Sequence, residues 1–406
     1  MSDMLGRVDS VSAVRSALAA LDGAEHLGAV ADRDDTAVLV RAAATDRLAA
    51  GGALYGRTIT VKDWVDVVGF VCEGELRERS GRRPPRDATA VARLRAAGGV
   101  VVAKTQPGGD HAIHGRCQHP VDATRTPGGT SSGEAALIGS GASTLGLGSD
   151  SGGSIRLPAA WCGVVGLKPS FGLVPTTGHF PRVGGRVDGR TVIGPMATNV
   201  ADIATVLDVI AGPDGVDHAC SPIPIDTTPV DINGLRVAVV QPDERWPVGS
   251  NTAAAVDAAV ACLLEHGAVE VGAVERLDLS ESLDITQRYW MRAHLTGAEC
   301  EQQLGDWDRF ASALLRSSTD FDVVIGPVVA DVAPVRRPLV GDDYVFTLPW
   351  SLTGWPAMSL PFGVDPSTGL PLAVQIAAPK WHDHVVLAVA AVLEKSATWA
   401  TLLERP

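Results

Sequence analysis

The sequence predicts an α/β protein in which helices cover both faces of a β-sheet. Residues 57–71 (RTITVKDWVDVVGFV) are apolar and β-branched, and they indicate a buried strand whose middle contains Lys62. Residues 88–99 (ATAVARLRAAGG) have the spacing of an amphipathic helix that ends at two glycines, and residues 100–105 (VVVAKT) follow as a strand. Helices that alternate with apolar strands are typical of a sheet that is packed on both sides.

The rest of the chain continues this alternation. Residues 11–50 are rich in alanine at helical spacing and predict one or two helices. Further helices are expected at 200–212 and 251–267, and further buried strands at 235–241, 321–327 and 371–379. In the helix at 251–267, Asn251 or Thr252 is the expected cap and Gly267 the expected stop. The only linker-like stretch, 222–229, is short, so we expect a single domain over residues 1–406.

The overall charge and the cysteines exclude several classes of protein. The net charge of −13 argues against binding to nucleic acid, which needs clustered Lys and Arg. Six scattered cysteines without a CxxC pair indicate free thiols in a reducing compartment. The N-terminus lacks a signal-peptide pattern, and no run of about eighteen uncharged apolar residues predicts a membrane span. We therefore expect a soluble cytoplasmic protein, and leave open whether it forms a homodimer.

No motif in the chain points to a cofactor. A GxxxxGK[ST] loop is missing, and the glycine-rich run at 139–148 follows a predicted helix, which favours close helix packing over dinucleotide binding. The cluster DHAIHGRCQH holds His111, His114, Cys117 and His119, a conceivable metal site. Such residues in a polar loop are more often pocket or surface residues. We expect neither a metal nor another cofactor.

Two serines are candidate nucleophiles. Residues 129–133 match GxSxG, the nucleophile elbow of α/β-hydrolases, with Ser131 at its centre. That elbow must follow a strand, and the preceding residues DATRTPGG do not predict one. Ser154 lies in SDSGGSIRLPAA, where two glycines allow successive backbone N–H groups to point at one oxyanion. The second context favours Ser154.

A serine hydroxyl needs a base, and Lys62 is the candidate. A lysine inside an apolar strand is costly to keep charged, so burial lowers its pKa. A buried strand lysine also pairs with a carboxylate about as often as it takes part in catalysis, and Asp63 and Asp66 are nearby. The residues alone leave both roles open.

The segment at 126–175, from TPGGTSSGEAALIGSG to FGLVP, closely resembles the signature of the amidase signature family. The flanks GRTITVKDWVDVVG and LTGWPAMSLPFGVDPSTGLPLAVQIAAP are similar to the same family, and the likeness covers roughly residues 50–395 in the right order. The resemblance implies an α/β/α sandwich around a mixed, twisted sheet. It also implies a serine, cis-serine, lysine triad.

Carried over position by position, the resemblance implies that Lys62 is the triad lysine and Ser154 the nucleophile. The bridging hydroxyl falls on Thr130, twenty-four residues before Ser154, where the family usually has serine after a cis peptide bond. Threonine keeps the hydroxyl, but its methyl group restricts χ1, and Ser131 is a candidate to support or replace it. The expected supporting residues are the oxyanion amides and two residues that brace the loop: Ser151, Gly152, Gly153 and Ser154, with Asp150 and Arg156.

The resemblance implies a hydrolase that cleaves a small-molecule carboxylic amide through a seryl acyl-enzyme. The alternatives are an A-type amidotransferase subunit, or a repurposed member of the family, because threonine replaces the bridging serine. We expect an N-terminal helical segment at 1–50, a catalytic core at 50–215 and a substrate-side half at 230–406. His111, Trp161 and Trp355 are candidate pocket residues, and the loop at 108–119 is expected to border the acyl pocket.

Overall fold

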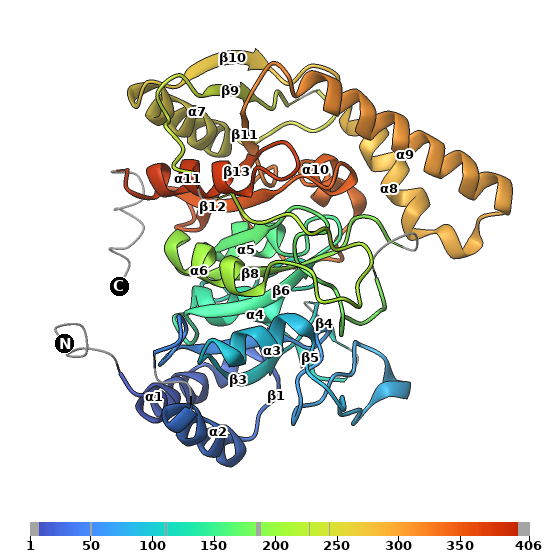
Figure 1. Ribbon diagram of the computed structural model, residues 1–406. Coiled ribbons are helices and arrows are strands. Elements are labelled where there is room, and N and C mark those ends of the chain that lie inside the picture. The colour runs from blue at the N-terminus through green and yellow to red at the C-terminus, as the bar shows by residue number, and fades with distance from the viewer. Residues whose placement is uncertain are drawn as a thin grey trace.

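The computed structural model describes residues 8–48, 51–108, 110–111, 113–183, 188–226, 228–242 and 244–396. Its centre is an 11-stranded sheet (Figure 1). The strands in sheet order are β1 (Val30–Asp32), β3 (Val100–Thr105), β2 (Thr58–Lys62), β6 (Leu145–Asp150), β8 (Val192–Ala197), β7 (Val165–Lys168), β12 (Ala357–Val364), β13 (Pro371–Ala377), β11 (Val323–Pro327), β9 (Arg236–Val239) and β10 (Val269–Ala273). Pairing is parallel on both sides of β2 and antiparallel between β6 and β8, so the expected mixed sheet is confirmed. The short strands β4 (Asp110–His111) and β5 (Gly115–Arg116) form a separate antiparallel pair.

Helices pack on both faces of the sheet. The helices are α1 (Ser10–Gly23), α2 (Asp35–Leu48), α3 (Thr89–Ala96), α4 (Ser132–Gly139), α5 (Arg156–Cys162), α6 (Val200–Ile210), α7 (Ser250–Glu265), α8 (Leu279–Trp290), α9 (Gly297–Ser317), α10 (Leu348–Leu352) and α11 (Asp383–Glu394). On one face, α3, α6, α11 and α7 contact one another in that order, and on the other face α4 packs against α5. The α/β/α arrangement implied by the resemblance is therefore confirmed.

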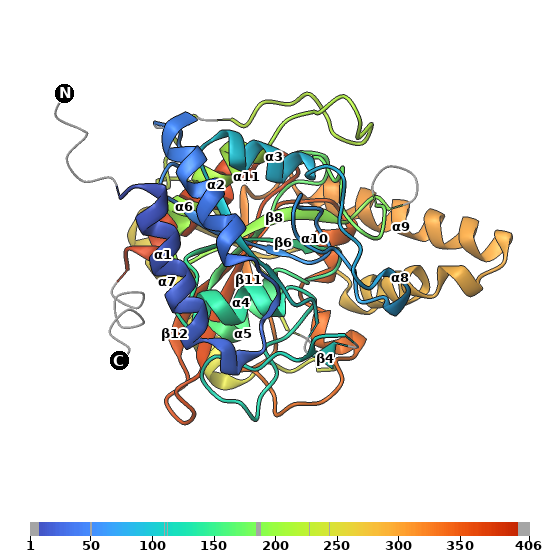
Figure 2. The same ribbon diagram turned by 90° about the horizontal axis from the view of Figure 1, so that it is seen from below.

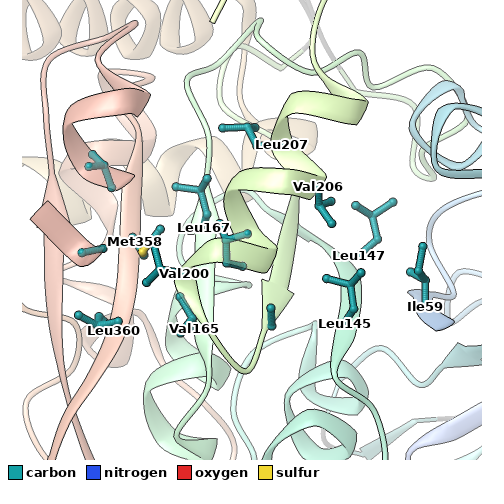
Figure 3. Packing of buried hydrophobic residues seen from close by; sticks show 14 of the residues in the cluster. Ile59, Leu145, Leu147, Val165, Leu167, Val200, Val206, Leu207, Met358 and Leu360 are labelled. Atoms are coloured by element: carbon teal, nitrogen blue, oxygen red, sulfur yellow. The ribbon is translucent and has the colours of Figure 1, made fainter. Parts of the chain in front are cut away.

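The core follows from the alternation of side chains along each strand. Leu145 and Leu147 of β6, with Leu167 of β7, point towards α6 and pack against Val206 and Leu207 (Figure 3). Strand side chains that point to the opposite face pack against α4 and α5. Met196 of β8, for example, packs with Ala159 of α5 and with Ile155, the residue before that helix. Strands that are buried on both faces have continuous apolar sequences, which is why β2, β3, β9, β11 and β13 were predictable.

The strands β6 and β7, which lie within the signature segment at 126–175, were not predicted. β6 has the sequence LGLGSD and is buried at every position. A Cβ built on Gly146 would lie 2.1 Å from Glu134 Oε2, and one on Gly148 would lie 2.9 Å from Ser131 Oγ. Helix α4 thus approaches β6 so closely that side chains are excluded. The expectation of close helix packing for residues 139–148 is confirmed.

Local boundaries differ in two places from the expectations. Lys62 is the last residue of β2, and not in the middle of the strand. Helix α7 begins at Ser250 after Gly249, one residue before the expected caps, and ends at Glu265, before Gly267 with a φ of 87°.

Helices α8 and α9 contact each other and extend away from the sheet (Figures 1 and 2). None of the described helices is long and apolar enough to cross a membrane.

Candidate active site

Lys62 leaves the end of β2 and reaches a group of hydroxyls. Its side chain has no exposed surface. The ammonium nitrogen lies 2.6 Å from Thr130 Oγ1, 3.2 Å from Ser131 Oγ and 3.1 Å from Ser149 Oγ. Burial lowers the pKa of Lys62 to about 7, although the nearby carboxylate of Glu75 acts in the opposite direction. A large fraction of this amine is therefore neutral at physiological pH.

The two carboxylates beside Lys62 in the sequence have other partners. Asp63 accepts hydrogen bonds from the backbone N–H groups of Glu73 and Gly74. Asp66 forms an ion pair with Arg82, at 2.7 Å. Within the described residues Lys62 forms no ion pair, so the alternative of a Lys62 ion pair with Asp63 or Asp66 is wrong. A buried lysine that contacts hydroxyls without a counter-ion is arranged to accept a proton.

The turn that carries Thr130 packs against the turn that carries Ser154. A Cβ built on Gly129 would lie 3.4 Å from the Cα of Ser154, and Ser131 N–H donates to the Ser154 carbonyl. Gly128 and Gly129 have φ values of 88° and 27°, which few side chains tolerate. The peptide bond before Thr130 is trans. The expected cis bond there is wrong, because the cis bond among the described residues is Phe180–Pro181.

A buried ion pair closes the Ser154 turn. Asp150, at the end of β6, lies 3.0 Å from Arg156, and neither side chain is exposed. Asp150 also accepts hydrogen bonds from the N–H groups of Gly153 and Ile155. Burial opposes the charge of Asp150, but the adjacent Arg156 guanidinium outweighs it and holds the pKa of that carboxyl at about 2. The expected bracing by Asp150 and Arg156 matches these contacts.

Part of the expected nest of amide donors is already occupied. The N–H of Gly153 donates to Asp150 at 2.7 Å, so it is not available to an oxyanion. The N–H groups of Gly152 and Ser154 have no acceptor within the described part of the chain. The Gly152 carbonyl accepts a hydrogen bond from Thr347 Oγ1 at 2.6 Å, which orients that peptide. The turn therefore presents fewer free donors than the sequence suggested.

Ser154 is half-buried and faces a cavity of about 360 Å³. Thr130, Ser149, Ser151 and Gly152 line the same cavity. Its remaining wall comes from distant segments and combines aromatic side chains with charged and small ones: Trp64, His179, Pro181, Arg182, Val183, Asp188, Thr191, Tyr289, Trp290, Arg292 and Tyr344. We call this space the catalytic cavity. The candidate nucleophile Ser154, the Thr130 hydroxyl beside the buried lysine and the free amide donors therefore all face one cavity.

Comparison with known proteins identifies the family of this chain. The family model described as Amidase matches residues 12–312 and 298–387. The chain belongs to the amidase family. Its relatives include the A-type subunit of the glutamyl-tRNA(Gln) amidotransferase of Anaeromyxobacter dehalogenans, 30% identical over 96% of this chain and 93% of that protein. An acylamidase of Rhodococcus erythropolis is 28% identical over 98% of this chain and 91% of that protein.

The amidase fold is also seen in solved structures. The structure of 6-aminohexanoate cyclic dimer hydrolase superposes with a TM-score of 0.84 and 25% identity, over 98% of this chain and 95% of that chain. The protein is therefore an amidase-family enzyme with the α/β/α fold of that family.

Two predicted pocket residues of this amidase-family chain are in the core. Trp161 is 3% exposed and donates its indole N–H to the Asp331 carbonyl, and it packs against Gly128 from behind the Thr130 turn. Trp355 is 2% exposed and stacks on Trp350 at 5.9 Å. Neither lines the catalytic cavity, so both assignments are wrong. Large aromatic side chains fill core space as readily as they line pockets.

The sequence missed the aromatic side chains that do line the cavity. Trp64 lies two residues after Lys62, and that proximity was an available signal. Tyr289 and Trp290 are at the end of α8, outside the signature segment and the flanks that carry the family resemblance. No local pattern links these residues to Ser154, because only the tertiary fold brings them together.

Residues of the DHAIHGRCQH cluster have separate partners. His114 Nε2 is 2.9 Å from Glu73 Oε2, and His119 Nε2 is 2.9 Å from the Trp161 carbonyl. No group of three or more potential metal ligands is present among the described residues. The side chain of His111 lies outside the described residues. Gly108 N–H donates to the Thr130 carbonyl, so the loop at 108–119 begins at the site, and its role in substrate choice stays a prediction.

Ser131 has a supporting position. Its hydroxyl is buried, receives a hydrogen bond from Lys62 and donates to the Ser149 carbonyl at 3.2 Å. It is the residue before α4, and a loop precedes it in place of a strand. This geometry does not match a nucleophile elbow.

Proposed function

We propose that the chain hydrolyses a small-molecule carboxylic amide through a seryl acyl-enzyme. Ser154 is the nucleophile, Lys62 the base, and Thr130 the hydroxyl that passes the proton between them. The observation that supports this most strongly is the 2.6 Å contact between Lys62 Nζ and Thr130 Oγ1, made by a buried amine without an ion-pair partner in the described residues.

The first half of the reaction forms an ester. Neutral Lys62 takes the proton of Thr130, while Thr130 takes the proton of Ser154. Ser154 Oγ bonds to the carbonyl carbon, and the oxyanion accepts hydrogen bonds from the N–H groups of Gly152 and Ser154. Collapse of this intermediate breaks the C–N bond, and the proton held by Lys62 returns through Thr130 to the leaving amine.

The second half releases the acid. A water molecule attacks the ester while its proton passes through Thr130 to Lys62. The C–O bond to Ser154 then breaks, and the proton returns from Lys62 through Thr130 to Ser154 Oγ. A serine nucleophile with a lysine base is a known variant of the serine–histidine–aspartate triad. The absence of a Ser154–Thr130 hydrogen bond within the described residues is compatible with this role, since catalytic contacts often tighten only when substrate binds.

A second candidate function has one observation in its favour. The relative from A. dehalogenans belongs to an amidotransferase, and it aligns over 96% of this chain. An amidotransferase passes ammonia onward to an acceptor, whereas an amidase transfers the acyl group to water. The net charge of −13 supports the small-molecule amidase.

The test combines labelling with a substrate panel. A fluorophosphonate probe is expected to label wild type on Ser154, and Ser154→Ala is expected to stay unlabelled. Aryl, short aliphatic and long acyl amides are then assayed for acid and amine products by the isolated chain. Wild type that is neither labelled nor hydrolyses any amide would indicate a repurposed member of the family.

A further inference from the structure

Two rings in the wall of the catalytic cavity carry polar atoms that the described residues leave unpaired. His179 is 7% exposed, and its Nε2 has no hydrogen-bond partner among those residues. The indole nitrogen Nε1 of Trp64 is buried and likewise has none. Both residues line the cavity together with Thr130 and Ser154. Buried polar atoms are normally satisfied, so these two atoms call for a ligand or ordered water.

The hydrogen bond at the other nitrogen of His179 settles which atom carries the proton. His179 Nδ1 lies 2.9 Å from the Pro181 carbonyl oxygen, which can only accept. Nδ1 therefore carries the hydrogen, and Nε2 of the neutral ring is an acceptor. Burial lowers the pKa of His179 to about 4, and Lys62 acts in the same direction. The ring is consequently neutral over the working pH range of most enzymes.

Trp64 supplies the complementary group. An indole nitrogen is a donor only. The rings of Trp64 and His179 are perpendicular, with an interplanar angle of 88° and centroids 6.0 Å apart. The amine of Lys62 lies 4.2 Å from the centre of the Trp64 ring, so this pair adjoins the proposed base. A donor and an acceptor thus sit on neighbouring rings beside the reacting groups.

The scissile amide cannot satisfy both atoms. Its carbonyl oxygen accepts hydrogen bonds from the N–H groups of Gly152 and Ser154 in the proposed reaction. The scissile amide then has no further oxygen to accept a hydrogen bond from Trp64. A second group of the substrate that offers both an N–H and a C=O would satisfy both. Carboxamide and ureido groups have this combination.

We propose that Trp64 and His179 bind a second amide-type group of the substrate, with its N–H on His179 Nε2 and its C=O on the Trp64 indole N–H. The substrate class is then a diamide or an amide with a ureido substituent. This inference rests on the proposed function, because it describes the substrate of Ser154. His179 and Trp64 determine specificity and take no part in proton transfer.

The experiment uses three matched amides that differ only in a terminal carboxamide, methyl ketone or ethyl group. The methyl ketone keeps the C=O and loses the N–H, and the ethyl group lacks both. Wild type is expected to prefer the carboxamide over the ketone, and the ketone over the ethyl compound, each by about 10- to 100-fold in kcat/KM. Chain-length variants of the series place the terminal group at different distances from the scissile bond.

Two variants separate the two contacts. In His179→Phe, the ratio of kcat/KM between the carboxamide and the ketone is expected to fall close to one. In Trp64→Phe, the ratio of kcat/KM between the ketone and the ethyl compound is expected to fall close to one. His179→Gln keeps an acceptor and is expected to retain part of the first ratio. Thermal melting and the rate of fluorophosphonate labelling at Ser154 show whether each variant is folded with a working nucleophile.

The outcomes distinguish this inference from the proposed function. Wild type that hydrolyses all three amides of every chain length at equal rates would overturn the inference and leave the amidase function intact. Ratios that survive in both His179→Phe and Trp64→Phe would also overturn it, because another group would then select the substrate. Wild type without labelling or hydrolysis would overturn the proposed function itself.

Discussion

Asp150 and Arg156 form an ion pair with no exposed surface, and the turn between them carries Ser154. Arg156 also donates to the Thr347 carbonyl, to Gln375 Oε1 and to Ser351 Oγ. The Arg156 guanidinium therefore links the Ser154 turn by hydrogen bonds to α10 and β13, which lie far along the chain.

Replacement of Arg156 tests this anchor. Arg156→Met leaves the Asp150 carboxylate buried without its partner, and such a loss costs about 3–5 kcal/mol of unfolding free energy. We expect that loss in urea unfolding. Arg236→Met is the matched control, since it breaks the partly exposed pair with Asp322 and should cost within about 1 kcal/mol. Equal losses in the two variants would contradict the role of Arg156.

Ser154→Ala is expected to reduce turnover below about one per cent of wild type, because the attacking oxygen is removed. Thermal melting should not change, since the Ser154 side chain makes no hydrogen bond within the described residues. Ser140→Ala, at the exposed end of α4, is the control and should keep full activity. Residual turnover of several per cent in folded Ser154→Ala would rule out Ser154 as the nucleophile.

The pKa of Lys62, lowered to about 7 by burial, predicts the pH profile. Only the neutral amine accepts a proton, so kcat/KM should rise through pH 7 and level off about one unit above it. A profile that falls between pH 7 and 9, with the protein still folded, would exclude a lysine base.

Lys62 should also affect stability in a pH-dependent way. Its folded pKa lies below the ordinary 10.5, so the unfolded chain binds more protons between these values and stability rises with pH there. Lys62→Met removes a charge that is costly to bury, and this variant should be inactive yet melt higher than wild type at neutral pH. A melting point below that of wild type at pH 7 would contradict this view of the site.

Thr130 is tested by two substitutions of different chemistry. Thr130→Ser keeps the hydroxyl and should retain turnover, whereas Thr130→Val keeps the shape and should lose at least about 100-fold in kcat. Ser131→Ala is the comparison, because Ser131 also contacts Lys62 but has a buried supporting position, and we expect a smaller loss. If Ser131→Ala is the more damaging change, Ser131 is the relay and Thr130 is not.

Many structural elements and candidate site residues of this protein were predictable because they depend on short stretches of sequence. Strands buried on both faces are continuous apolar runs, and Ser154, Thr130 and Lys62 lie within short segments of distinctive composition. The strand β6 escaped prediction because its glycines serve close contact with α4, and contact across elements leaves no period in the sequence.

The sequence by itself determined the α/β class, since helical and strand periodicity depend on residue type and near neighbours. Its resemblance to the amidase family added the candidate hydroxyls and the candidate base. The tertiary structure alone decided that Lys62 lacks an ion-pair partner among the described residues, that Gly153 N–H is already bonded, and that Trp161 is in the core. It also brought Trp64 and His179 together. Burial and hydrogen-bond partners depend on segments far apart in the chain, and only their packing establishes them.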